Sequence, residues 1–119
     1  MGDFQKLEVW QEAHKLTLQI YKLTYKLPKS EQFTLTPHTR RTAISVESNI
    51  AEGESRYSVK EKIQFFVISR GSIAEIKSQL LIISDLFIKL KDESKNIFNK
   101  YCNLEKRLNS LISYHRSKK

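Results

Sequence analysis

The sequence predicts an all-α protein that folds as one up-down-up-down antiparallel four-helix bundle. Three observations support this. Only 3 glycines and 2 prolines occur in 119 residues, too few for a turn-rich β fold. Apolar residues recur at spacings of three and four in four segments, which is the helical period. Prolines, a glycine and a capping motif separate these segments. The length fits a single domain over residues 1–119.

We expect the first helix over residues 3–27. One apolar stripe runs along it, with successive spacings of 4, 3, 4, 3 and 4, formed by Val9, Ala13, Leu16, Ile20, Leu23 and Leu27. Pro28 ends this helix, because a residue before proline is pushed out of the α region.

The second helix is expected over residues 37–54. Thr36 suits the N-cap, and Pro37 suits the first helical position, where its missing N–H costs nothing. The apolar positions predicted for this helix are Ala43, Ile44, Val46, Ile50 and Ala51. Gly53 is expected to stop the helix in the left-handed conformation.

The third helix, over residues 59–90, opens with a capping box formed by Ser58 and Glu61. It carries more apolar residues than one face of a helix needs. Either it lies at the centre of the bundle, or its extra face is buried against another subunit. The fourth helix is expected over residues 94–114, capped by Asp92 or Ser94.

The charge balance favours a polyanionic partner. Lys and Arg number 21 against 13 Asp and Glu, a formal net charge of +8. Nucleic acid is the first candidate and an anionic membrane surface the second. The alternative is that the charge only keeps the protein soluble. The single cysteine, Cys102, and the lack of a signal-peptide pattern or a run of about 18 apolar residues lead us to expect a cytoplasmic protein without a membrane span.

The sequence offers no recognisable set of residues for catalysis. His14, His38 and His115 fall on three different predicted helices, and none belongs to a metal-binding motif. There is no glycine-rich phosphate loop and no G-x-S-x-G motif. We therefore expect no metal, no cofactor and no enzymatic activity.

Clustered cations are the candidate nucleic-acid-binding residues, because phosphate contacts need flexible positive charges. They are Arg40, Arg41, Arg56, Lys60, Lys62, Lys106, Arg107, Arg116, Lys118 and Lys119. Tyr57 is placed to stack on an unpaired base, or to pack at an interface. The competing interpretation of each lysine is a solvated surface residue.

A second group of polar residues, Arg41, Asn49, Glu52, Arg70 and Glu75, predicts a structural network between helices two and three. We expect Arg41 or Arg70 to pair with Glu52 or Glu75, fixing the helix register. The neighbouring residues 71–74 include Gly71, Ser72 and Ala74 and predict a shallow spot where another helix packs closely.

Several segments together resemble a known family. They are residues 7–13, 20–21, 28, 31–35, 40–45, 48–53, 56 and 70–75, which include Asn-Ile-Ala-Glu-Gly at 49–53 and Arg-Gly-Ser at 70–72. The family is the bacterial four-helix bundle first met as reading frames in intervening sequences of large-subunit ribosomal RNA genes. The resemblance covers nearly the whole chain and is weakest in the fourth helix. His38 stands near a position where glutamine is common.

The resemblance implies a four-helix bundle that assembles as a homopentameric ring. A distantly similar bundle, the accessory protein of diversity-generating retroelements, is basic and pentameric and binds RNA and a reverse transcriptase. The ribosomal label of the family reflects gene location and does not make its members ribosome components. We therefore expect a non-enzymatic homo-oligomer that binds RNA, with a nucleic-acid-processing protein as a further partner. The alternative is a protein-interaction or structural ring without a nucleic-acid role.

Overall fold

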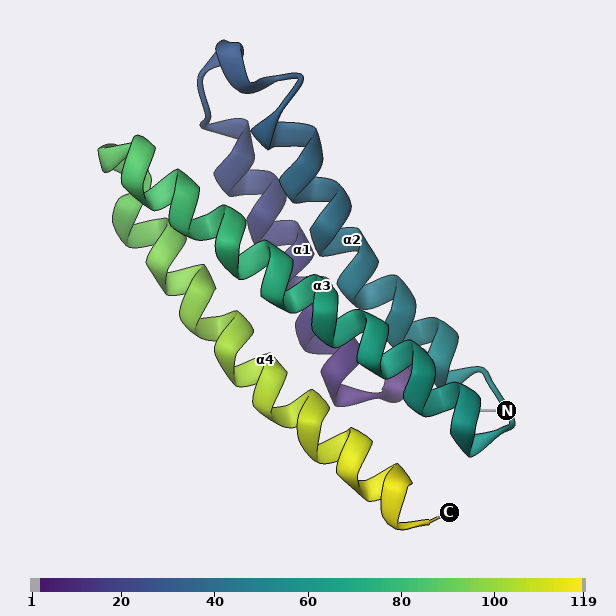
Figure 1. Ribbon diagram of the computed structural model, residues 1–119. Coiled ribbons are helices and arrows are strands. Elements are labelled where there is room, and N and C mark those ends of the chain that lie inside the picture. Colours follow the sequence, from purple (N-terminus) through teal and green to yellow (C-terminus); the bar gives the residue numbers. More distant parts are fainter. Residues whose placement is uncertain (1–2, 119) are drawn as a thin grey trace.

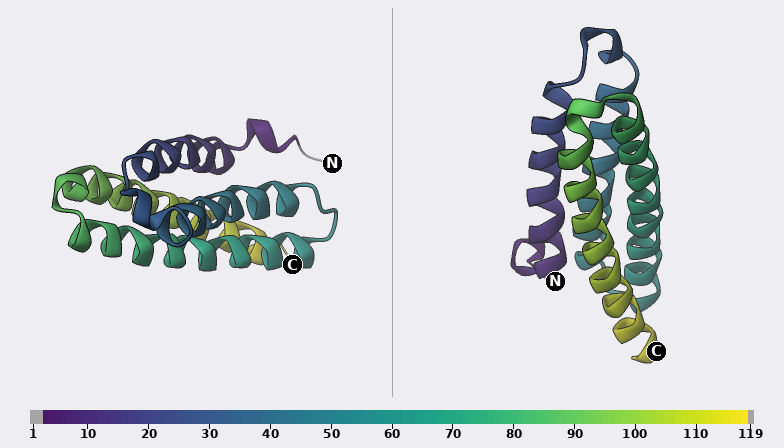
Figure 2. Two further views of the ribbon diagram at one scale, coloured as in Figure 1. Left: turned by 90° about the horizontal axis from the view of Figure 1, so that it is seen from above. Right: turned by 90° about the vertical axis from the view of Figure 1, so that its left-hand side faces the viewer.

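The computed structural model describes residues 3–118, and four long helices make up most of it (Figure 1). They are α1 (Glu8–Tyr25), α2 (Leu35–Glu54), α3 (Val59–Leu86) and α4 (Lys91–Ser117). Consecutive helices pack side by side and run in opposite directions, and α4 also packs against α1 (Figure 2). The predicted up-down-up-down bundle is confirmed.

The bundle is 47 Å long and about 20 Å wide, so its two ends are far apart. One end, here the terminal end, holds the start of α1, the α2–α3 turn and the end of α4. The other, the connector end, holds the link between α1 and α2 and the turn between α3 and α4. The links carry short 3-10 helices, η2 (Lys29–Glu31) and η3 (Ile88–Leu90).

The core is a continuous apolar column to which every helix contributes. The predicted stripe of α1 is buried along its whole length. Phe66, Ile73 and Ile76 of α3 and Tyr101 and Leu104 of α4 are fully buried opposite it. Buried hydroxyls join neighbouring helices within this column: Ser69 donates to the Val46 carbonyl at 2.7 Å, and Ser94 donates to the Leu80 carbonyl at 2.7 Å.

The first expected helix is interrupted near its start. Asp3 accepts a hydrogen bond from the Gln5 N–H and caps η1 (Phe4–Lys6), a separate 3-10 turn. Leu7 then adopts an extended conformation, and its side chain packs against the core. This apolar contact changes the direction of the chain, so the continuous helix begins at Glu8 and ends at Tyr25.

The second helix begins two residues earlier than expected, at Leu35, so Thr36 is inside the helix and is not its N-cap. Pro37 still lies in the first turn, where its missing N–H leaves no intrahelical bond unmade. The expected left-handed Gly53 is wrong: no glycine described here has a positive φ, and α2 continues through Gly53 to Glu54. The close packing of Phe66 against Gly53 explains the glycine at this position.

The boundary between the last two helices lies earlier than predicted. Phe87, at φ −122° and ψ 86°, ends α3 at Leu86 instead of residue 90. α4 begins at Lys91, so residues 91–93 are helical although they were expected to form a polar loop. Ser94 is therefore not a cap, because its hydroxyl is buried and bonded to α3. The predicted N-cap at Ser58 is confirmed by a 3.2 Å bond from the Glu61 N–H.

Among the residues described, none of the helices combines the length and the apolar character needed to span a bilayer.

Candidate nucleic-acid interface

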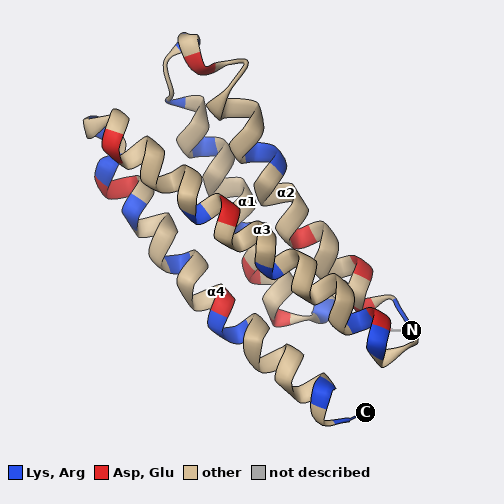
Figure 3. Ribbon diagram, in the orientation of Figure 1, with Lys and Arg blue, Asp and Glu red and all other residues tan. Residues whose placement is uncertain are grey.

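The cations predicted to bind nucleic acid do not form one patch in the structure. Lysines and arginines are spread over all four helices, with carboxylates between them (Figure 3). Five of the predicted residues reach the terminal end of the bundle: Arg56, Lys60, Lys62, Arg116 and Lys118. Arg40 and Arg41 lie towards the connector end, and Lys106 and Arg107 lie along α4. Lys119 is outside the described residues.

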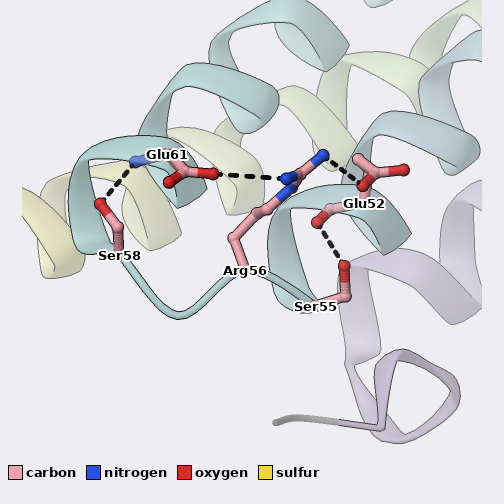
Figure 4. Close-up of polar contacts among 5 residues, drawn as sticks. All are labelled: Glu52, Ser55, Arg56, Ser58 and Glu61. Atoms are coloured by element: carbon pink, nitrogen blue, oxygen red, sulfur yellow. Dashed lines mark hydrogen bonds and ion pairs between the residues drawn. The ribbon is translucent and has the colours of Figure 1, made fainter.

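Arg56 is held by contacts within the protein. Its guanidinium bonds Glu52 at 2.7 Å and Glu61 at 3.4 Å (Figure 4). The guanidinium also lies 4.7 Å from the centre of the Phe65 ring. Glu61 also starts α3, through its backbone N–H to Ser58. These contacts tie the end of α2 to the start of α3 and leave Arg56 little freedom to follow a phosphate.

Arg107 and Lys62 are also engaged within the protein. Arg107 forms ion pairs with Glu12 and with Glu8, the latter at 3.3 Å, and so joins α4 to α1. Lys62 donates to the Glu54 carbonyl at 2.8 Å. Of the predicted cations, five are exposed and have no side-chain hydrogen-bond or ion-pair partner within residues 3–118: Arg41, Lys60, Lys106, Arg116 and Lys118.

The ion pair predicted between helices two and three is wrong. Glu52 pairs with Arg56, four residues along the chain, because Arg56 lies just beyond the end of α2, about one turn from Glu52. Arg70 faces α4 and donates to Asn109 at 3.0 Å. Within the described chain, Arg41 and Glu75 are exposed and have no hydrogen-bond or ion-pair partner.

The polar contact that does join α2 to α3 at this level is smaller. Ser45 and Ser72 share a 2.8 Å hydrogen bond between their hydroxyls. Asn49, a predicted member of the network, donates to the Ser45 carbonyl at 2.9 Å and so belongs to this contact. A hydrogen bond between two hydroxyls therefore joins α2 to α3 here, where an ion pair was expected.

A surface that the sequence analysis did not single out combines cations with aromatic rings. It is the solvent side of α1 with the adjoining side chains of α2 and α4, here called the α1 face: Lys15, Leu18, Tyr21, Lys22, Tyr25, Arg40, Arg41 and Lys100. Between α1 and α4, a hollow is lined by Glu12, Lys15, Leu16, Gln19, Lys100 and Asn103. Between α1 and α2, a second hollow is lined by Tyr21, Arg40 and Arg41.

The carboxylates nearest the α1 face are already engaged. Glu47 accepts from His14 at 3.1 Å, Glu93 pairs with Lys26 at 2.8 Å, and Glu12 pairs with Arg107. Lys15, Lys22 and Arg41 have no hydrogen-bond or ion-pair partner in the part of the chain that is described. The face therefore offers free positive charge without free negative charge.

The sequence carried a signal for this surface. Lys15, Leu18, Lys22 and Tyr25 follow the same three-and-four spacing as the core stripe of α1, displaced to the opposite side. The core stripe explains which side is buried, and the complementary stripe shows what the helix presents to solvent.

α3 presents a second surface with a different character, here called the α3 face. Its exposed residues between 64 and 86 are Gln64, Ile68, Gly71, Ala74, Glu75, Ser78, Leu81, Ile82, Asp85 and Leu86. None is a cation, and Ile68, Leu81 and Ile82 are each more than two-fifths exposed. The predicted apolar excess of this helix is thus present at the surface of the single chain.

Three ionisable groups have pKa values displaced by their surroundings. The hydrogen bond from Lys77 to Glu105, at 2.8 Å, raises the pKa of Lys77 above its ordinary 10.5. Burial raises the pKa of the Tyr101 hydroxyl far above its ordinary 10. Burial, and then the nearby charge of Lys62, lowers the pKa of His115 below its ordinary 6.5.

These groups do not converge on a common site. Lys77 and Glu105 join α3 to α4, and His115 lies beside Phe66 at the terminal end. Within residues 3–118, no group of three histidine, cysteine or acidic side chains is placed to hold a metal ion.

The chain matches a known protein family. The family model described as 23S rRNA-intervening sequence protein matches residues 5–110, which is most of the chain. No curated protein matches.

Proposed function

Since the chain belongs to the 23S rRNA-intervening sequence protein family, we propose that it is a non-enzymatic, homo-oligomeric protein that binds RNA through its α1 face. The observation that carries this proposal is the composition of that face. Free lysines and an arginine alternate there with exposed tyrosines, and the nearest carboxylates are engaged elsewhere. Cations attract phosphates, and aromatic rings stack on unpaired bases.

Oligomerisation is part of the proposal, because it would gather several copies of a weak site. Linked copies can bind one RNA far more tightly than a single copy does. The α3 face supports self-association, since it exposes aliphatic side chains, lacks cations and leaves the α1 face free. We propose five subunits, from the resemblance to ring-forming bundles, and a nucleic-acid-processing protein as a further partner.

A second function is favoured by the same α3 face taken alone. In this case the protein is a structural or protein-interaction ring, and its positive charge only keeps it soluble. Both functions predict an oligomer. They differ in whether the cations of the α1 face have a ligand.

RNA binding across a salt series separates the two functions. The test uses the purified full chain, a fragment of host 23S rRNA and duplex DNA of the same length, with the mass measured in parallel. A triple variant, Lys15→Gln/Lys22→Gln/Lys100→Gln, removes cations from the α1 face. A matched variant, Lys29→Gln/Lys89→Gln/Lys91→Gln, removes the same charge at the connector end.

We expect binding that weakens steeply with salt and a reduced salt slope for the α1-face triple variant. Each lost phosphate contact lowers the slope by about 0.7 for a single strand, so three contacts lower it by about 2. The matched variant should keep the wild-type slope. An oligomer that binds no RNA at low salt would leave the interaction ring as the function.

Self-association through the α3 face has its own test. Ile82→Glu places a charge on that face, and Leu18→Glu places the same charge on the α1 face. We expect Ile82→Glu alone to reduce the mass towards that of one chain. An unchanged mass for both variants, at low protein concentration, would place the subunit interface elsewhere.

A further inference from the structure

The hollow between α1 and α2 combines a planar cation, an aromatic ring and a free arginine. Tyr21, Gln32, Pro37, Arg40 and Arg41 line it, and its volume is about 360 Å³, within the range of small-ligand sites. No carboxylate lines it. This composition suits a ligand that is both flat and negatively charged.

Arg40 is fixed in place before any ligand arrives. Its Nε donates to the hydroxyl of Thr24 at 2.9 Å, and its Nη2 donates to the Tyr21 carbonyl at 3.4 Å. Thr24 is itself buried and bonded to the Ile20 carbonyl at 2.7 Å. The Arg40 guanidinium lies 4.5 Å from the centre of the Tyr21 ring. A stack held in this way loses little conformational entropy when a base joins it.

Part of the hydrogen-bonding capacity of the two arginines is unused. A guanidinium has five N–H donors. In the described chain, neither Nη1 of Arg40 nor the guanidinium of Arg41 has a hydrogen-bond partner. Arg41 is exposed beside the hollow, so its donors are available to a phosphate.

We propose that this hollow binds one unpaired nucleotide of a single-stranded RNA. The base stacks on the Tyr21–Arg40 pair, and its phosphate bonds Arg41. The Gln32 amide, which can both donate and accept, contacts the base edge without demanding one base. Paired bases in a duplex are stacked on each other and cannot enter the hollow, so it selects single strands. This inference rests on the proposed function, since it names the part of the α1 face that distinguishes unpaired RNA.

The test uses an eight-nucleotide RNA that carries one 2-aminopurine, whose fluorescence falls when it stacks on an aromatic group. The strand is titrated alone and as a duplex, and adenosine monophosphate is then added as a competitor of the bound strand. Tyr21→Leu removes the stacking ring, and Arg41→Gln removes the phosphate contact without touching packed residues. Tyr114→Leu and Lys89→Gln are the matched controls, because Tyr114 is an exposed tyrosine near the end of α4 and Lys89 lies on η3.

We expect the single strand to bind with quenching and the duplex to bind without it. Tyr21→Leu should weaken single-strand binding on the order of tenfold and abolish the quenching. Arg41→Gln should weaken it several-fold and lower the salt slope by about 0.7. Neither control should change the affinity as much. Recovery of the fluorescence when adenosine monophosphate displaces the strand at comparable affinity would overturn the assignment to single strands and make the hollow a free-nucleotide site.

Failure of this inference can be told from failure of the proposed function. If the protein binds the strand but Tyr21→Leu and Tyr114→Leu are equally mild, the hollow is not the site, and RNA binding still holds. If the wild-type protein binds neither the strand nor the longer rRNA fragment at low salt, the proposed function fails as well.

Discussion

Substitution of Gly53 by alanine tests the packing between α2 and α3. A Cβ atom at Gly53 would lie 2.7 and 2.9 Å from two carbons of the Phe66 ring and 3.2 Å from the Lys62 carbonyl oxygen. Non-bonded carbons prefer about 3.5–4.0 Å, so the ring would have to move by roughly 1 Å. Phe66 is fully buried and has no free space to move into.

The expected effect is a net loss of stability. Overpacking of this kind costs about 1–3 kcal/mol. Alanine returns up to about 1 kcal/mol through its higher helix propensity. We therefore expect Gly53→Ala to lower the free energy of unfolding by about 1–2 kcal/mol. Gly71 is the matched control, because a Cβ atom there meets nothing within 4 Å. Gly71→Ala should therefore raise the free energy of unfolding by about 0.5–1 kcal/mol.

Urea unfolding followed by far-UV circular dichroism measures both variants, at one protein concentration because self-association adds to stability. In a Phe66→Leu background, Gly53→Ala should cost less, since the ring that it meets is gone. A Gly53→Ala protein as stable as Gly71→Ala would refute the argument. A Gly71→Ala chain that unfolds at higher urea but forms a smaller oligomer would mean that another subunit packs on Gly71.

Three further predictions concern the displaced pKa values and one buried hydroxyl. Tyr101→Phe should leave the free energy of unfolding at neutral pH unchanged or raise it by about 1 kcal/mol, because the buried Tyr101 hydroxyl has no hydrogen-bond partner in the described chain. A loss of more than about 1 kcal/mol in urea unfolding would reveal a partner for this hydroxyl. The pKa of Lys77 is raised, so the stability from its bond to Glu105 is present below pH 10.5 and is lost as pH rises through the higher folded value. On a Tyr101→Phe background, Lys77→Met should therefore flatten the alkaline part of the stability–pH curve. An unchanged curve would argue against this pair. The pKa of His115 is lowered, so its contribution is present above pH 6.5 and is lost as pH falls below that value; His115→Gln should reduce the acid loss between about pH 6.5 and 5, and thermal unfolding across that range checks it.

The α1 face and the α3 face differ in composition and lie on different helices. The α1 face is basic and aromatic, whereas the α3 face exposes aliphatic side chains and two carboxylates and has no cations. Burying the α3 face in a ring would leave the α1 face accessible on every subunit. The proposed RNA binding and the proposed self-association therefore do not compete for the same residues, and the Ile82→Glu and Lys15 variants can be interpreted independently.

The spacing of apolar residues was enough to predict the four helices and their order. The period of 3.6 residues is a local property of the chain, and short links between amphipathic helices allow few arrangements other than an antiparallel bundle. The Ser58 cap was also predictable, because a capping box is formed by neighbours in the sequence. Helix ends at Leu7 and Phe87 were not, since side-chain packing against distant residues changed the backbone there.

Charge partners depended on the tertiary structure. Arg41 and Arg70 were the cations expected to pair with Glu52, but the ion pair is formed with Arg56. Arg107 met Glu12 across about ninety residues of sequence, which no local pattern indicates. Gly53 is a glycine because Phe66 lies against it, although its position near a helix end suggested a backbone reason.

By itself, the sequence determined that this chain is a basic four-helix bundle and that one helix has apolar surface to spare. Only the tertiary structure decided which cations are free, because an ion pair depends on distance in space and the composition gives only the number of charges. It also brought Tyr21, Arg40 and Arg41 from two helices to one hollow. Core positions repeat with the helix and can be predicted from it, whereas a binding surface is formed where separate helices meet.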